Sequence, residues 1–126
     1  MKILLAVPDR DLLSSLEIYL SLCGNEVVSA FDGIQAASAA ANGGFDIALV
    51  DPELSRTTFG EMSRLFGETK TPVIALTKTR LPAGNATSAS CLAYPFTPSE
   101  LTERINEVVK KTVKKTENNR MVTDNE

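Results

Sequence analysis

Short, continuous runs of apolar residues, separated by segments with helical spacing, constrain the fold of this chain more than any other feature. The clearest runs cover residues 3–7, 45–50 and 71–76. Runs of this length without regular polar alternation are typical of strands buried on both faces, as in a parallel sheet. Their alternation with helical segments predicts an α/β domain with a doubly wound parallel sheet of five strands.

The segments between these runs carry helix signals. A helix is expected after the first strand, and it ends before Gly24. Its apolar stripe at helical spacing consists of Leu12, Leu16, Tyr19, Leu20 and Cys23. A second strand is expected at residues 26–30, and Asp32 then caps a helix that runs through the alanines of residues 36–41. A third helix is expected near residues 61–66.

The last helix has the strongest start signal. Thr97-Pro98-Ser99-Glu100 is a capping box with proline at the first helical position. Its buried stripe is expected to consist of Leu101, Ile105, Val108, Val109 and Val113. Beyond Val113 the apolar periodicity is lost. We therefore predict one domain over residues 1–113 and a polar, flexible tail over residues 114–126, or a linker to a further domain.

Composition excludes several function classes. The 126 residues are 43% hydrophobic and 23% charged, which is sufficient for one globular core. A net charge of -3 argues against nucleic acid as a direct partner. No apolar stretch approaches the roughly 18 residues of a membrane span, and the start of the sequence has no secretory signal pattern, so we expect a cytoplasmic protein. The chain has two cysteines and no histidine, which is too few for a disulfide framework or a zinc site.

Two strands deliver polar groups to one edge of the predicted sheet. Asp51 follows the run at residues 45–50, and Thr77 follows the run at residues 71–76. The carboxyl ends of parallel strands form the ligand crevice in open α/β sheets, so a carboxylate there is placed for chemistry. The alternative for Asp51 is a structural aspartate that accepts hydrogen bonds from nearby backbone N–H groups.

These residues, in this order and spacing, resemble the receiver domains of two-component response regulators, including the single-domain chemotaxis regulators. The resemblance covers residues 1 to about 113. It rests on six segments, which are Lys2-Ile3-Leu4-Leu5, Gly24-Asn25-Glu26-Val27-Val28, Phe31-Asp32-Gly33, the run ending in Asp51, Pro72-Val73-Ile74-Ala75-Leu76-Thr77, and Tyr94-Pro95-Phe96 followed by Glu100-Leu101.

The resemblance implies a flavodoxin-like fold with strand order 2-1-3-4-5 in three αβα layers. It also implies that Asp51 accepts a phosphoryl group from a histidine kinase and that the Thr77 hydroxyl binds that group. The expected partners are proteins, either a histidine kinase or an output protein. The bond before Pro95 is expected to be cis, which directs the Tyr94 phenol toward the pocket and allows it to bond Asp51.

The chain departs from the family pattern at several positions. Val7 and Pro8 occupy the positions of the acidic pair that helps to bind Mg²⁺, and Asp9 comes one residue late. Tyr94 replaces the family lysine, and a phenol with a pKa of about 10 carries no positive charge at neutral pH. Further departures are Pro52, which has no N–H to donate, Cys91 in place of the family's aromatic switch residue, and a shortened segment after Thr77 in which the fourth helix is expected to be short or missing.

Two residues are candidates to compensate for these losses. The Lys78 ammonium could fold over Asp51, and the Glu53 carboxylate could join Asp9 and Asp51 as a metal ligand. The structural alternatives are solvent-facing charges at Lys78 and Glu53 and a helix cap at Asp9. Only a rebuilt site of this kind would bind Mg²⁺, and no other cofactor is expected.

We therefore predict a receiver-like interaction module without enzymatic activity and with a degenerate phosphorylation pocket. The alternative is a working phosphoacceptor at Asp51 with a rebuilt site. An aspartate-nucleophile phosphatase is disfavoured because its Asp-x-Asp motif follows the first strand, whereas Asp51-x-Glu53 follows the third. A flavin domain is disfavoured because Pro8-Asp9-Arg10-Asp11 offers carboxylates where a phosphate loop would need N–H groups and hydroxyls.

Overall fold

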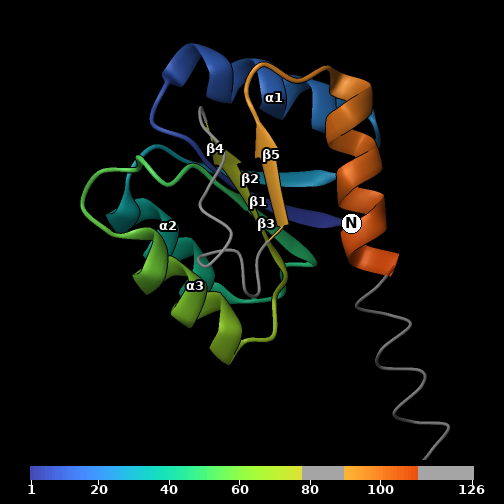
Figure 1. Cartoon of the computed structure of the whole chain (residues 1–126). Helices are drawn as coiled ribbons and strands as arrows, with labels where there is room; N and C mark the ends of the chain where they lie inside the picture. Colours follow the sequence, from blue (N-terminus) through green and yellow to red (C-terminus); the bar gives the residue numbers. More distant parts are fainter. Residues whose placement is uncertain (78–89, 111–126) are drawn as a thin grey trace, which may run out of the picture.

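The computed structural model describes residues 1–77 and 90–110 (Figure 1). Lys78, the segment expected to contain a short or missing fourth helix, and the predicted domain boundary at Val113 all lie outside the described residues. Within the described residues, no helix combines the length and the apolar character that crossing a membrane requires.

Five parallel strands form a single sheet in the order β2-β1-β3-β4-β5, which confirms the predicted topology. The strands are β1 (Lys2–Ala6), β2 (Glu26–Ala30), β3 (Ile47–Val50), β4 (Val73–Thr77) and β5 (Ser90–Ala93). The helices are α1 (Arg10–Leu22), α2 (Gly33–Asn42), α3 (Phe59–Glu68) and a C-terminal helix over residues 98–110. Strand β2 lies at one edge of the sheet and β5 at the other.

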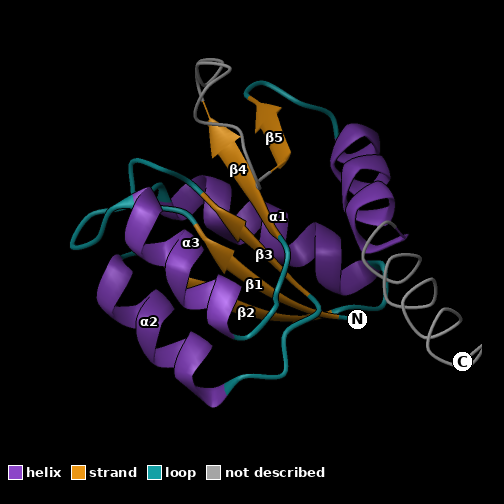
Figure 2. Ribbon diagram, turned by 60° about the horizontal axis from the view of Figure 1, so that its bottom comes forward, coloured by secondary structure: helices purple, strands orange, loops and turns teal. Residues whose placement is uncertain are grey.

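The helices cover both faces of the sheet, which gives the predicted three layers. Helix α1 and the C-terminal helix, orange in Figure 1, pack on one face, and α2 and α3 pack on the other (Figures 1 and 2). Strand β1 shows why both faces need cover, since its buried side chains alternate between the two cores. Ile3 and Leu5 belong to the core under α1, whereas Leu4 and Ala6 belong to the core under α2 and α3.

Local signals set the helix ends as the sequence predicts. The Asp32 side chain accepts a hydrogen bond from the backbone N–H of Gln35 at 2.9 Å and so caps α2. The predicted capping box is present, because Glu100 N–H donates to the Thr97 hydroxyl at 3.1 Å and the Glu100 carboxylate accepts from Thr97 N–H at 3.1 Å. Gly24 follows α1 with a φ of 92°, a conformation that favours glycine.

The third strand begins later than the sequence predicts. Phe45 and Asp46 precede β3, which starts at Ile47. At Asp46 the side-chain carboxylate accepts the Lys2 N–H at 2.7 Å, while the Asp46 N–H donates to the Lys2 carbonyl at 2.8 Å. The Asp46 carboxylate thus accepts the Lys2 N–H in place of a main-chain carbonyl, and the regular β1–β3 pairing begins one residue later, at Ile47.

Candidate functional site

Three polar side chains come from the carboxyl ends of the three neighbouring strands β3, β4 and β5. Asp51 directly follows β3, Thr77 is the last residue of β4, and Tyr94 directly follows β5. Asp51 and Thr77 are the two buried polar or charged residues of the described chain, each with 5% of its surface exposed. The Asp51 N–H donates to the Ala6 carbonyl at 2.9 Å, which extends the β1–β3 ladder to this residue.

Both carboxylate oxygens of Asp51 accept hydrogen bonds. Oδ1 accepts the backbone N–H of Glu53 at 2.9 Å, and Oδ2 accepts the Tyr94 hydroxyl at 3.3 Å. The Asp51 carbonyl also accepts the N–H of Leu54 at 3.0 Å. Asp51 therefore organises the turn after β3, as the structural alternative for this residue predicts.

Tyr94 is held in place from both sides. Its N–H donates to the Thr77 carbonyl at 2.7 Å, and its ring stacks on Phe96 with centroids 5.2 Å apart. The Tyr94-Pro95 bond is cis and the phenol contacts Asp51, and both observations agree with the sequence-based expectation. Sequence reasoning did not identify Phe96 as support for the phenol, although the aromatic-proline-aromatic spacing was an available signal.

The environment of Tyr94 keeps its phenol protonated. Partial burial raises the pKa of Tyr94 well above its usual value, and the charge of Asp51 and the hydrogen bond to it raise the pKa further. The carboxylates of Asp9 and Glu53 add smaller contributions in the same direction. The phenol is therefore a neutral hydrogen-bond donor to Asp51 at physiological pH.

Thr77 presents a buried hydroxyl that lacks a hydrogen-bond partner within the described structure. Most buried hydroxyls are paired, because an unpaired one loses its bonds to water without replacement. The hydroxyl at the end of β4 is therefore a polar group that a bound group could satisfy.

Two of the three predicted metal ligands have structural roles in this structure. Asp9 is the N-cap of α1, and its Oδ1 accepts from the N–H groups of Asp11 at 3.0 Å and Leu12 at 3.2 Å. Glu53 is exposed. Across residues 1–77 and 90–110, no group of three or more acidic, histidine or cysteine residues is arranged to hold a metal ion. Asp9 thus serves as a helix cap and Asp51 as a turn residue, and a metal site made of Asp9, Asp51 and Glu53 stays a prediction.

The remaining departures from the family pattern are visible around this edge. Pro52 is partly buried directly after Asp51 and offers no N–H group. Cys91 lies in β5, and its carbonyl accepts a hydrogen bond from Arg104 of the C-terminal helix. This contact could not be predicted, because the spacing along the chain does not show which helix residue reaches an edge strand.

Comparison with known proteins finds similar solved structures but no matching family model or curated protein. Among solved structures, the fold is similar to a CheY-like receiver domain from Methanospirillum hungatei, with a TM-score of 0.81, 23% identity, and coverage of 90% of this chain and 97% of that one. The fold is that of a response regulator receiver domain.

Two further receiver domains have similar values. The receiver domain of the Francisella response regulator 1452 has a TM-score of 0.77 and 23% identity, with 88% of this chain and 98% of that chain covered. The receiver domain of a Pseudomonas aeruginosa sensor histidine kinase has a TM-score of 0.76 and 26% identity, with 86% and 97% covered, and it carries a magnesium ion in its active-site cleft. At the corresponding edge of this chain, Asp9 caps α1 and Asp51 accepts the Glu53 N–H in the turn after β3.

Proposed function

We propose that this chain is a receiver-like interaction module of a two-component system in which phosphate control has been lost. It carries no enzymatic activity and binds a protein partner, either a histidine kinase or an output protein. The receiver fold supports the signalling context, and the arrangement around Asp51 supports the loss of phosphorylation.

The hydrogen bond from the Tyr94 hydroxyl to Asp51 Oδ2 carries this proposal. An attacking carboxylate oxygen must be accessible to the incoming phosphorus, whereas Asp51 is 5% exposed and both of its oxygens are hydrogen-bonded. The phenol is further held by its stacking on Phe96. A phosphoryl donor would therefore have to displace a supported aromatic side chain before reaching the acceptor.

Electrostatics point in the same direction. Transfer of a phosphoryl group to a carboxylate brings anions together, so it needs cations that offset the charge that develops. Around Tyr94 the described charges are the carboxylates of Asp51, Asp9 and Glu53, and the phenol itself is neutral. These carboxylates repel a phosphoryl dianion at Asp51, so the charges that the described residues place beside Tyr94 oppose phosphorylation.

A working phosphoacceptor is the second candidate, and the Thr77 hydroxyl favours it. This hydroxyl is buried and unpaired within the described residues, and a phosphoryl oxygen would satisfy it. In this case Asp9 and Glu53 would rearrange to bind Mg²⁺, and Lys78 would supply the missing cation. The two candidates differ in their response to metal and to a phosphoryl mimic.

An amide NMR titration with Mg²⁺, followed by beryllofluoride as a mimic of aspartyl phosphate, separates the two candidates. We expect no saturable shifts at Asp51, Glu53 or Thr77 at millimolar Mg²⁺ and no further change with beryllofluoride. The matched control is Asp51→Asn, because asparagine keeps an oxygen that accepts the Glu53 N–H. Saturable shifts in the natural sequence that disappear in Asp51→Asn would overturn the proposal and establish the phosphoacceptor.

A further inference from the structure

The outer edge of β2 exposes backbone hydrogen-bonding groups. The Glu26 N–H donates to the Met1 carbonyl at 3.0 Å, and the Ala30 carbonyl accepts the Val7 N–H at 3.0 Å. Because alternate residues of a parallel strand bond the same neighbour, Glu26, Val28 and Ala30 face β1. Val27 and Ser29 therefore direct their N–H and C=O groups outward, where the described structure has no further strand.

The two edges of the sheet differ in how their outward backbone groups are hydrogen-bonded. At β5, Tyr94 N–H bonds Thr77, so Cys91 faces outward, and its carbonyl accepts a hydrogen bond from the Arg104 side chain. At the end of β2, the outward N–H of Phe31 is likewise satisfied, by Gln35 Oε1 at 2.9 Å. The open part of the β2 edge is thus limited to Val27 and Ser29.

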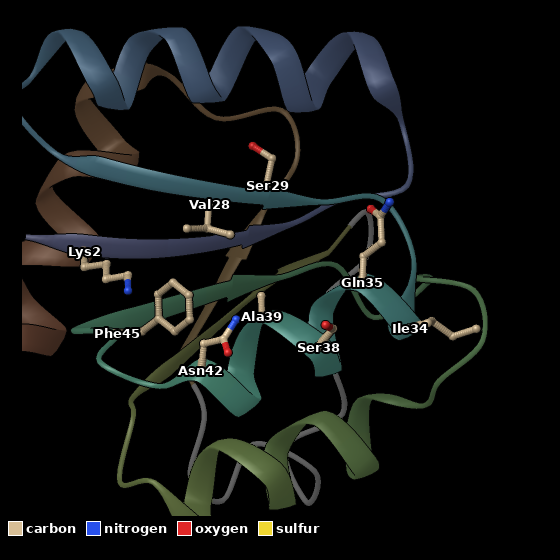
Figure 3. A pocket seen from close by; sticks show the side chains of 9 residues that line it. All are labelled: Lys2, Val28, Ser29, Ile34, Gln35, Ser38, Ala39, Asn42 and Phe45. Atoms are coloured by element: carbon tan, nitrogen blue, oxygen red, sulfur yellow. The ribbon is translucent and has the colours of Figure 1, made fainter.

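A groove of about 460 Å³ runs between this edge and α2 (Figure 3). Its size follows from the sequence of α2, in which alanines such as Ala39 leave the space beside Val28 unfilled. Ser29 also lines the groove, although Figure 3 shows its hydroxyl directed away from α2, toward α1. The part of Ser29 that faces the groove is therefore its backbone, which carries the outward hydrogen-bonding groups.

The two ends of the groove differ in chemistry. At one end the Lys2 ammonium lies 4.9 Å from the centre of the Phe45 ring and 3.5 Å from the Gly43 carbonyl. At the other end Ile34 is 57% exposed, and the groove lining contains no carboxylate. The salt-bridge partner of Lys2 is Glu26, 3.8 Å away, whose side chain is 71% exposed. An occupant that matches the groove is apolar at the Ile34 end and places an acidic group at the Lys2 end, where it competes with the exposed Glu26 carboxylate for the ammonium.

We propose that this edge binds an extended segment of a partner protein, which adds a strand beside β2. The backbone of the segment exchanges hydrogen bonds with Val27 and Ser29, as in other cases of strand addition. Alternate side chains of the segment enter the groove, one acidic beside Lys2 and one apolar beside Ala39 and Ile34. Because β2 has five residues, a span of about 16 Å, these two side chains are two or four positions apart. The site lies outside the Asp51 pocket and goes beyond the function proposed above.

The test is selection of random nonapeptides displayed on phage against the full chain, with counter-selection on Ala39→Leu, which fills the groove. We expect enriched peptides with an acidic residue two or four positions from an apolar one. Their synthetic versions are then measured by fluorescence anisotropy on Lys2→Glu, Ser29→Pro and Ser29→Ala. Proline removes the outward N–H, which an edge strand can lose. Alanine keeps that N–H and removes a hydroxyl that has no hydrogen-bond partner among the described residues.

We expect Lys2→Glu and Ser29→Pro to weaken binding by about tenfold or more, and Ser29→Ala to stay within about twofold of the natural sequence. Circular dichroism checks that each variant is folded. If Ser29→Pro does not fold, slowed amide exchange at Val27 and Ser29 of the natural sequence on peptide addition is the required result.

Three results of the peptide experiments would overturn the proposal. They are an absence of enrichment over the Ala39→Leu protein, equal peptide affinity in Ser29→Pro and Ser29→Ala, and amide exchange at Val27 and Ser29 that the peptide leaves unchanged. A dimer of the chain seen by light scattering and lost in Ser29→Pro would also overturn it, by assigning the edge to a second copy.

Discussion

Replacing Tyr94 by phenylalanine removes one hydroxyl and leaves the ring, so it isolates the hydrogen bond to Asp51. Hydrogen bonds to charged acceptors contribute roughly 1.5–3 kcal/mol to stability. The hydrogen bond from Tyr94 to Asp51 is 3.3 Å long and the phenol is only partly buried, so we expect its contribution to stability to lie below that range. We expect the free energy of unfolding to fall by about 1 kcal/mol, because Asp51 keeps the Glu53 N–H but loses the hydrogen bond from the phenol.

The assay is urea unfolding followed by far-ultraviolet circular dichroism, since the chain has no tryptophan. The matched control is Tyr19→Phe, which removes the other phenol hydroxyl, 3.1 Å from the Thr102 hydroxyl. That contact joins two neutral groups, so we expect a loss of about 0.5–1 kcal/mol there. A Tyr94→Phe variant as stable as the natural sequence at neutral pH would refute the assignment of a stabilising bond to Asp51.

The same variant has a defined dependence on pH. An unfolded tyrosine ionises near pH 10, whereas the raised pKa of Tyr94 keeps the folded phenol protonated to higher pH. The stability that this group contributes is therefore complete below about pH 10 and is lost as the pH rises further. We expect the stability difference between the natural sequence and Tyr94→Phe to shrink above about pH 10. A difference that is constant from neutral pH into this range would contradict the raised pKa.

Two further changes test the frame around the site. Gly33→Ala should lower stability by about 1–3 kcal/mol, because the added Cβ would lie 2.5 Å from Thr57 Cβ. The Cβ added in Gly67→Ala meets no described atom within 4 Å, so this change should raise stability by about 0.5–1 kcal/mol. Thermal melts that rank the two variants in the opposite order would contradict this packing. Asp9→Ala should cost about 0.5–2 kcal/mol by removing the α1 cap, and Asp9→Asn should cost a few tenths, since asparagine caps as well. Equal losses in urea unfolding of both Asp9 variants would show that charge, and not capping, is what Asp9 contributes.

The fold could be predicted from the sequence because β1, β3 and β4 lie in short apolar runs and the helices carry clear capping signals. The position of Asp51 at the strand edge followed from the same pattern, and the contact with Tyr94 followed from the family resemblance. The sequence left the roles of Asp9 and Glu53 open between a metal site and structural roles, because spacing brings residues to one edge without showing which oxygens a cap or turn already uses. The groove beside β2 also went unpredicted, since it arises from the space that small α2 side chains leave open.

The turn at Asp51 has a consequence for how such a residue persists through evolution. Its Oδ1 accepts the Glu53 N–H and its carbonyl accepts the Leu54 N–H, so the residue shapes the path from β3 toward α3. This task needs a short side chain with an oxygen and requires no reactivity. If phosphoryl transfer is lost, as we propose, selection for folding alone is enough to retain an aspartate or to admit an asparagine. In this fold, the presence of an aspartate after the third strand is therefore not sufficient evidence that the residue accepts a phosphoryl group.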